Sequence, residues 1–462
     1  MSTRTIVRTA LGSIAGLALA GTAVLAGTGT LPGLTPASWG GSADAPHVSV
    51  TPPPAETVLA CDGPLVGLGL DATDASALAN IGSLDLTIGT GGGSEPESSD
   101  DLDLEGVGSA TILTQQPDGD QPVAVAGAGS VMLDDVSAVG YAISSCRPGA
   151  PEAWIAGASG QTGVSDVVII GNASDVPATV SLEVYGVEGR TVPAGGEFAV
   201  PAHGQRAVPV AGIAGGEQNP VIRVTSRNAP VRVTLQSTTT SGLTPQGFDL
   251  EESTLPMTNA VVPRVRVTRS TASAGSTATT AQLTATTTTG GTAHVAVVDE
   301  ATGDVVAEAD VEMVPEIPVS AAFDELPEGS YAVRMTSDVP FVSAVRQSAG
   351  NDYAWYTPGE PLTGESIVAA PAGNDGKIAL SFASLGDDAT VTLTPVSGGD
   401  AVSANLAAGR STTLVVDDQA TYRITIEGGA VVGAAGTSDD GRIGSFSIAP
   451  DPATPDPVVV TP

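Results

Sequence analysis

Basic residues are scarce in this chain. Its 462 residues include 17 Lys+Arg against 51 Asp+Glu, which gives a formal net charge of −34, and Lys377 is the only lysine. Acidic residues occur at an ordinary frequency, so the imbalance comes from missing bases rather than from added acids. Because scattered arginines cannot build a phosphate-neutralising surface, the composition argues against nucleic acid as a partner.

Aromatic residues are also few, at 3% of the chain, although hydrophobic residues as a whole reach 41%. The core must therefore be built from Val, Ala, Leu and Ile, which suits thin sheets better than large helical bundles. Glycine and proline, with 57 and 34 residues, stay below the share typical of a disordered low-complexity chain. These amounts predict a folded protein rich in β-structure.

Cysteine is nearly absent, since Cys61 and Cys146 are the only two. In an exported chain an even number of cysteines predicts a disulfide. The bond would close a loop of about 85 residues, which is worth on the order of 4–5 kcal/mol in the chain-entropy description. The alternative is that both residues are unpaired small hydrophobic side chains.

The N-terminus has the pattern of an export signal. Arg4 and Arg8 precede Ala10–Gly27, which carries no charge. The length of this segment lies between the apolar core of a signal peptide and a full membrane span, and the two arginines orient the rest of the chain outward. We therefore expect a signal peptide or membrane anchor at 1–30, through which an uncleaved chain would meet the membrane, and a flexible stalk at 31–56.

Beyond the stalk, short alternating runs bounded by Gly, Pro, Asn and Asp predict strands and turns. Examples are Val180–Val184, His294–Val298 and Val391–Thr394. The best helix candidate is the short stretch Ala75–Ile81. The expected fold class is all-β, with an N-terminal hydrophobic helix and stalk followed by tandem antiparallel β-sandwich-like domains.

Weak internal repeats divide the later part of the chain. Ala178–Leu182 (ATVSL) recurs as Ala389–Leu393 (ATVTL), and Arg223–Ser226 (RVTS) has echoes at Arg334–Ser337 (RMTS) and Arg423–Ile426 (RITI). The repeated segments are spaced at roughly the length of one β-sandwich domain, which predicts three β-sandwich units. A smaller β-rich module, cross-linked by the two cysteines, precedes them. The expected boundaries are 57–149 for the module, 150–257, 258–349 and 350–449 for the three units, and 450–462 for a Pro-rich acidic tail.

Three segments carry a likeness to known proteins: Cys61–Leu65 (CDGPL), Cys146 shortly before Trp154, and Asn172–Gly186 (NASDVPATVSLEVYG). Together they resemble an actinobacterial family of exported, N-terminally anchored proteins of unknown function with repeated β-rich units. The chain departs from the family pattern where Ala156-Gly157 follows Trp154 and where Ala173 follows Asn172. The resemblance supplies no catalytic residues.

The histidines give no sign of a catalytic or metal centre. His47 lies in the expected stalk, while His203 and His294 fall in different expected units, and none belongs to a metal-binding or catalytic-triad motif. No nucleophile elbow or phosphate-binding loop is present in the sequence. We therefore expect a protein that is not an enzyme and has no cofactor.

One acidic segment begins like a calcium-binding loop. Asp101, Asp103 and Glu105 occupy its first, third and fifth positions, and Gly106 its sixth, but Ile112 stands where a bidentate carboxylate is needed. The same alternation is typical of a strand whose acids face solvent. The three acids are therefore a weak calcium candidate.

Tyr353, Trp355 and Tyr356 form the only local aromatic cluster of the sequence. If exposed, the rings could form a platform on which sugars stack. If buried, they would form an apolar plug between two units. The sequence alone leaves both possibilities open.

These patterns predict a non-enzymatic extracytoplasmic cell-envelope protein that acts as a scaffold, spacer or adhesion module. Its expected partners are other envelope proteins or cell-wall polysaccharide. One alternative is polysaccharide binding through Tyr353–Tyr356. A further alternative is a hydrolase that uses paired carboxylates.

Overall fold

A computed structural model describes residues 48–50, 53–69, 77–92, 95–242, 244–268, 279–324, 326–373, 375–439, 442–453 and 458–460. The expected signal peptide or anchor at 1–30 lies outside this part of the chain. Within the expected stalk, β1 (Val48–Val50) pairs antiparallel with β33 (Val458–Val460). All other described strands belong to a second unit, which spans Pro53–Pro455.

Strands dominate the described residues, as the alternating runs predict, and α2 (Val210–Ile213) is the only helix among them. None of the described helical structure is long and apolar enough to span a membrane. The expected helix at Ala75–Ile81 is wrong, because its second half belongs to β4 (Leu78–Gly82), which pairs with β3 (Leu65–Leu68). So short a segment gains too little as an isolated helix, whereas Ile81 packs on a hydrophobic cluster as part of the strand.

An N-terminal group of eight strands holds both cysteines at its margins. The strands of this N-terminal group are β2 (Thr57–Ala60), β3, β4, β5 (Asp85–Thr90), β6 (Glu97–Leu104), β7 (Gly108–Gln115), β8 (Val125–Asp134) and β9 (Val139–Ser145). β5, β8 and β9 form one sheet. β6, β7 and β2 extend a sheet of the following group, because β6 pairs with β15 (Gly204–Pro209).

Three repeat groups follow, and each packs its strands in an antiparallel arrangement around its own hydrophobic core. The first repeat group contains β10 (Glu152–Ile155), β11 (Val167–Asn172), β12 (Ala178–Gly186), β13 (Gly189–Thr191), β14 (Glu197–Val200), β15 (Gly204–Pro209), α2, β16 (Val221–Arg227), β17 (Arg232–Ser241) and β18 (Thr244–Glu252). The second contains β19 (Met257–Val267), β20 (Thr279–Ala285), β21 (Gly291–Asp299), β22 (Val305–Met313), β23 (Val319–Phe323), β24 (Gly329–Ala349) and β25 (Asp352–Tyr356). The third contains β26 (Leu362–Ala370), β27 (Lys377–Ser384), β28 (Ala389–Pro395), β29 (Val402–Leu406), β30 (Ser411–Asp417), β31 (Ala420–Asp439) and β32 (Arg442–Ile448).

The sequence repeats mark the same pair of neighbouring strands in each repeat group. The ATVSL and ATVTL segments lie in β12 and β28, and their partners β16 and β31 carry arginine-led segments. In the second repeat group the arginine-led segment lies in β24, which pairs with β21. Arg223 stands opposite Glu183, and Arg423 stands opposite Thr394. The alternation of apolar and Thr or Ser residues in these strands places Val and Leu in the core, with Thr and Ser only partly buried.

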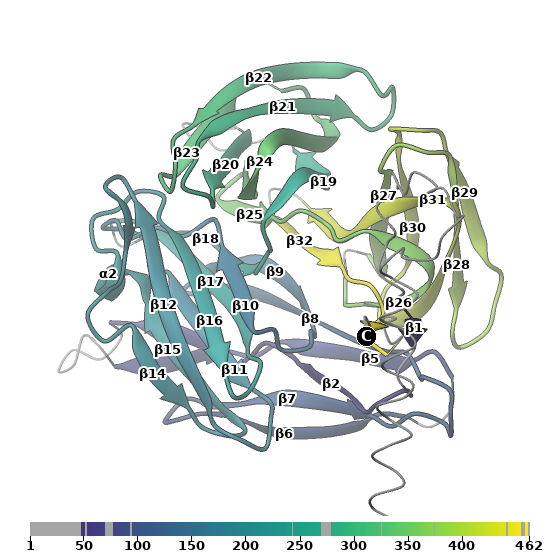
Figure 1. Cartoon of the computed structure of the whole chain (residues 1–462), viewed down its shortest axis with the longest axis horizontal. Coiled ribbons are helices and arrows are strands. Elements are labelled where there is room, and N and C mark those ends of the chain that lie inside the picture. The colour runs from purple at the N-terminus through teal and green to yellow at the C-terminus, as the bar shows by residue number, and fades with distance from the viewer. Residues whose placement is uncertain are drawn as a thin grey trace, which may run out of the picture. The chain divides into compact units, whose positions relative to one another are not determined.

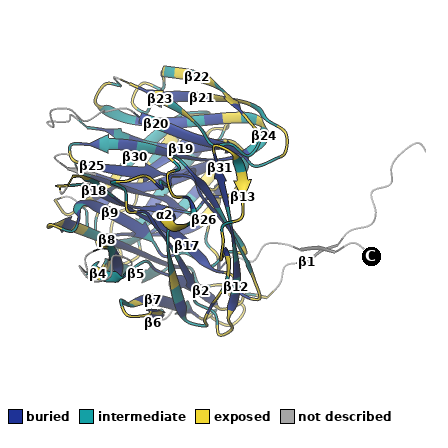
Figure 2. Ribbon diagram, turned by 90° about the vertical axis from the view of Figure 1, so that its left-hand side faces the viewer, coloured by how far each residue is buried: buried dark blue, intermediate teal, exposed yellow. Residues whose placement is uncertain are grey.

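Four strands meet in the middle of the Pro53–Pro455 unit. β9, β18, β25 and β32 each form the second strand of a hairpin, after β8, β17, β24 and β31. Each lies at the edge of its sheet and packs on two others of the four (Figure 1). These central strands are largely buried, whereas outer strands such as β22 carry exposed residues (Figure 2). The edges of four sheets are thereby brought to one place.

Candidate functional site: a buried carboxylate hub

Cys61 and Cys146 form the predicted disulfide, with their sulfur atoms 2.00 Å apart. Cys61 follows β2, and Cys146 follows β9. The backbone beside the bond is also paired, because Ala60 and Arg147 exchange two N–H···O bonds of 2.8 and 3.0 Å. The disulfide therefore fixes the start of the N-terminal group to the end of the first central strand.

The aromatic cluster lies in the interior. Tyr353, Trp355 and Tyr356 of β25 are only 1%, 5% and 3% exposed. Tyr353 and Trp355 pack with Ala156 of the first repeat group, and the Tyr353 hydroxyl lies 2.7 Å from Ser237 Oγ. Tyr353 and Trp355 therefore fill the space between two repeat groups, and Tyr356 packs in the core of the second repeat group. The three rings do not form an exposed platform for sugars.

The calcium candidates lie on the surface of β6 and in the turn after it. Asp101, Asp103 and Glu105 are exposed, while Leu102 and Leu104 between them are buried. No group of three or more His, Cys, Asp or Glu side chains placed to hold a metal ion occurs in the described part of the chain. The segment has the alternation of a strand with its acids turned to solvent.

Four acidic side chains that the sequence analysis did not single out lie where the central strands meet. Asp249, Glu251 and Glu252 come from β18, and Asp352 comes from β25; we call these four residues the carboxylate hub. None of them is more than 5% exposed. Acidic side chains are rarely so deeply buried unless their oxygens are hydrogen-bonded, so their partners show what the hub does.

Asp352 binds the backbone of two other central strands. Its Oδ2 accepts a hydrogen bond of 3.0 Å from the N–H of Tyr141 in β9, and its Oδ1 accepts one of 3.3 Å from the N–H of Phe248 in β18. Burial raises the pKa of Asp352 to about 7, although bonds from backbone N–H groups, including that of Ile443 in β32, oppose the rise. One carboxyl group thus contacts all three of the other central strands.

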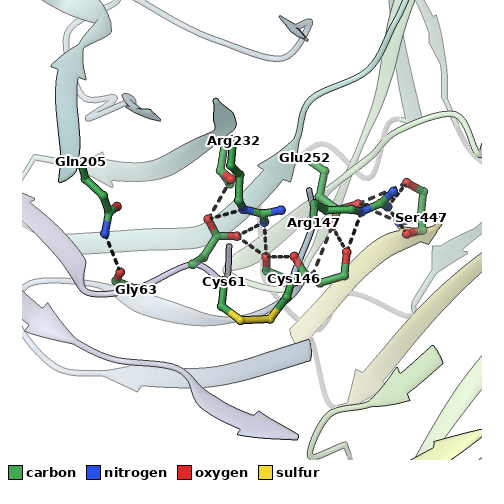
Figure 3. Close-up of polar contacts among 12 residues, drawn as sticks. Cys61, Gly63, Cys146, Arg147, Gln205, Arg232, Glu252 and Ser447 are labelled. Atoms are coloured by element: carbon green, nitrogen blue, oxygen red, sulfur yellow. Dashed lines mark hydrogen bonds and ion pairs between the residues drawn. A yellow bond between two sulfur atoms is a disulfide. The ribbon is translucent and has the colours of Figure 1, made fainter. Parts of the chain in front are cut away.

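Glu252 binds the ends of two central strands and an arginine. Its Oε1 accepts from the N–H and hydroxyl of Ser145, at the end of β9. Its Oε2 accepts from Arg147 Nη2 at 2.8 Å and from the N–H and Oγ of Ser447 in β32, each at 3.2 Å. Arg147 also donates to the carbonyl of Ser447 (Figure 3). This ion pair ties the N-terminal group to the first and third repeat groups.

Asp249 and Glu251 complete the hub toward the second repeat group and the loop after β10. Asp249 Oδ2 accepts from the N–H of Trp355 at 2.6 Å. Glu251 Oε1 accepts from the N–H groups of Ala156 and Gly157 at 3.0 and 3.1 Å. Burial raises the pKa of Glu251 to about 8, and nearby Asp166 adds to that rise. The pKa of Asp249 is also raised by burial, to well above its usual range.

A second buried ion pair lies next to the disulfide (Figure 3). Arg232 of β17 donates through Nε and Nη2 to Asp62, which also accepts from Thr234 Oγ1 at 2.8 Å and from Ser144 Oγ. Burial raises the pKa of Asp62, but Arg232 together with the bonds from Ser144 and Thr234 outweighs burial and leaves that pKa below its usual value. Asp62 therefore stays ionised and holds the N-terminal group against the first repeat group.

The hub supplies hydrogen-bond acceptors to backbone N–H groups at the edges of the sheets. An edge strand presents unpaired N–H groups, and buried backbone N–H groups need an acceptor. Where four edges meet from different directions no common ladder can form, and the oxygens of side-chain carboxyl groups supply the acceptors instead. The arrangement holds four groups of strands together, and it leaves no exposed acid pair at the centre for catalysis.

Sequence periodicity could not reveal the hub. In β18, Asp249 and Glu251 alternate with Phe248 and Leu250, which is the pattern expected of a strand with one face in water. For the second buried ion pair the only local hint is Asp62, which lies beside Cys61 in a segment already marked by its likeness to known proteins. The pairing of Asp62 with Arg232 spans 170 positions and leaves no short motif.

A comparison with protein-family profiles matches residues 103–419 to DUF5719, a family of unknown function. No curated protein matches the chain. The matched region contains all four hub residues and the strand pairs of the first two repeat groups, and it ends at Gln419, just before β31.

Proposed function

Because the chain belongs to the DUF5719 family of unknown function, we propose a function from its geometry: a non-enzymatic scaffold or interaction module of the extracytoplasmic cell envelope. The observation that carries this proposal is the carboxylate hub. It joins four groups of strands through buried bonds from Asp352 and Glu252. A body built in this way presents several sheet faces outward in fixed relation to one another.

The extracytoplasmic location draws support from two independent features. The segment Ala10–Gly27 has the composition of an export signal or anchor, and disulfides such as Cys61–Cys146 persist in oxidising compartments. The likeness to exported actinobacterial proteins agrees with both. We further propose that each repeat group acts as a β-sandwich unit, carried outward on the residues that precede it.

The two alternative functions receive less support. Sugar stacking on Tyr353, Trp355 and Tyr356 would need rings at the surface, and these rings are buried. A carboxylate-based hydrolase needs an acid pair open to substrate, whereas Asp249 and Glu251 are fully buried and bound to backbone N–H groups. The scaffold role remains the function that the hub supports best.

Fractionation of the native host tests the proposed location. The chain is followed through cytoplasm, membrane and culture fluid, and its thiols are alkylated with and without prior reduction. We expect the chain in the membrane or the culture fluid, with Cys61 and Cys146 labelled only after reduction. A cytoplasmic chain whose thiols react without reduction would refute the proposal.

Cross-linking of intact cells tests the scaffold role. The wild type should form adducts with other envelope proteins or with cell-wall polysaccharide, and E252A should form fewer because it breaks the hub. E183A is the matched control, since Glu183 pairs with Arg190 and Arg223 within one repeat group. Equal adducts from wild type and E252A, or none from either, would count against a scaffold.

A further inference from the structure

A cleft of about 770 Å³ lies between the second and third repeat groups. Residues of β19, the β21–β22 turn and the start of β24 line one side, and the end of β29 and β30 line the other. Its volume is in the range of small-ligand sites. The cleft is separate from the carboxylate hub and shares no residue with it.

The strand β19 is bulged beside this cleft. The pairing of β19 with β24 shifts between Val262 and Val265, and Arg264 within the bulge has a φ of 59°. Its N–H donates to Glu300 Oε1 at 3.1 Å, and Glu300 Oε2 accepts from Thr413 Oγ1 at 3.2 Å. Bulges re-aim side chains near functional sites, and left-handed backbone at a large side chain persists only where surrounding contacts hold it.

The guanidinium of Arg264 lines the cleft without a hydrogen-bond acceptor among the residues that the structure describes. Both oxygens of neighbouring Glu300 are already engaged, by the backbone of Arg264 and by Thr413. Burial lowers the pKa of Arg264, while the charge of Glu300 opposes this shift. The guanidinium nitrogens are open to the cleft, where the acceptor of a ligand can take the place of water.

The other charged groups of the lining have partners. Asp299 Oδ1 accepts from backbone N–H groups of the β21–β22 turn, including that of Thr302 at 2.8 Å. Glu328 lies 3.6 Å from Arg266 Nη2. Arg410 donates to carbonyls of the same turn. Among the charged side chains of the lining, the guanidinium N–H groups of Arg264 are therefore the donors available to a ligand.

We propose that this cleft binds an acidic saccharide, with its carboxylate paired to Arg264. A planar guanidinium matches a carboxylate in two-point geometry. Ser330 lines the cleft from one side, and Ser411 and Thr412 line it from the other. Among the described lining residues alanine is the largest apolar side chain, which favours a ligand covered in hydroxyl groups. This binding activity goes beyond the scaffold role and does not depend on it.

Calorimetric titration of the full chain tests the site, with trigalacturonate as the probe and neutral galactotriose of the same linkage as the matched ligand. We expect the wild type to bind trigalacturonate at least tenfold more tightly than galactotriose. R264Q should lose at least tenfold in affinity for trigalacturonate, and R264K should lose less because it keeps the charge without the planar fork. In nitrogen-15 spectra, the Nε–Hε signal of Arg264 should shift on binding.

R227Q is the control, because Arg227 is an exposed arginine of the first repeat group that pairs with Glu197 and does not line the cleft. It should bind as the wild type does. Thermal unfolding of each variant confirms that it is folded. The proposal is overturned if trigalacturonate does not bind at 10 mM, if folded R264Q binds it as tightly as the wild type, or if galactotriose binds equally well.

Discussion

Asp249, Glu251 and Asp352 take hydrogen bonds from backbone N–H groups rather than from arginines. Without a cation beside it, a buried carboxyl group favours its protonated form, and the pKa values of Glu251 and Asp352 rise to about 8 and about 7. Asp62 has the opposite setting, since Arg232 lowers its pKa. At the residue scale, the interior therefore contains two kinds of acid with opposite responses to pH.

The raised pKa of Glu251 predicts that alkaline pH weakens the fold. Between about pH 4.5 and 8 the folded state retains a proton that the unfolded chain has released, so the free energy of unfolding falls as pH rises through this range. E251Q removes this titration and should be more stable than the wild type at pH 9 by on the order of a few kcal/mol. Urea unfolding between pH 5 and 9 measures the effect.

The exposed acid Glu105 provides the control, and E105Q should follow the wild-type profile. The free energy of unfolding of E251Q should still fall in part as pH rises, because other buried carboxyl groups with raised pKa values, such as Asp352, still titrate. A wild-type stability that rises from pH 5 to 8, or an E251Q profile parallel to that of the wild type, would contradict the assignment.

At the scale of the strand, packing of the central edges leaves no room for added atoms. Gly140 of β9 has a φ of 154°, and a Cβ there would lie 2.6 Å from Asp352 Oδ1 and 2.7 Å from the N atom of Phe248. A methyl group at this position would push β9 away from β18 and β25. The close approach of these three strands depends on this glycine.

We therefore expect G140A to lower the free energy of unfolding by roughly 1–3 kcal/mol or more, the usual cost of overpacking. G212A in α2 is the matched control, because a Cβ at Gly212 meets no atom within 4 Å, and it should be neutral or slightly stabilising. Urea unfolding of both variants measures the difference. The packing argument fails if the two substitutions have equal effects.

How far the sequence predicts this structure is clear from two strands with the same local pattern. Asp101 and Asp103 alternate with leucines in β6 and face water, whereas Asp249 and Glu251 alternate with Phe248 and Leu250 in β18 and are buried. Periodicity predicts that both segments are strands. It cannot predict what covers the polar face, because that depends on segments about a hundred residues away in the sequence.

The features that sequence did predict are those with a local or compositional signal. The repeated ATVSL and ATVTL segments correctly mark equivalent strands, since their partners carry the arginine-led repeats. The disulfide followed from a count of two cysteines. The helix at Ala75–Ile81 was wrong because pairing with β3 outweighed a short local preference.

At the scale of the molecule, the few basic residues gather at junctions between groups. Arg232 joins the N-terminal group to the first repeat group, Arg147 reaches the first and third, and Arg334 of the second donates to carbonyls of Ser384 and Gly409 in the third. A net charge of −34 therefore coexists with an interior in which cations connect parts of the chain. The acidic side chains on the surface that have no neighbouring cation give the molecules a negative charge, and this charge makes them repel one another in solution.

These junctions predict that Pro53–Pro455 unfolds as one cooperative unit. Calorimetry should show a single transition for the wild type, with the calorimetric and van't Hoff enthalpies in agreement. E252A leaves Arg147 without its buried partner, which typically costs about 3–5 kcal/mol. This variant should unfold at a lower temperature and in a broader or divided transition.

E183A, which breaks ion pairs within one repeat group, should retain a single transition. Well-separated transitions in the wild type would show that the repeat groups fold independently, and would rule out a hub that couples them.

The hub also sets the order in which the molecule can be finished. Its first strand, β9, ends at Ser145, and its last, β32, begins at Arg442. Glu252 cannot acquire its bonds to Ser447 until the chain has been made as far as β32, and contacts so distant in sequence form slowly. A growing chain therefore cannot complete the hub until its third repeat group has been made, so the groups made earlier must wait for it before their edges are joined.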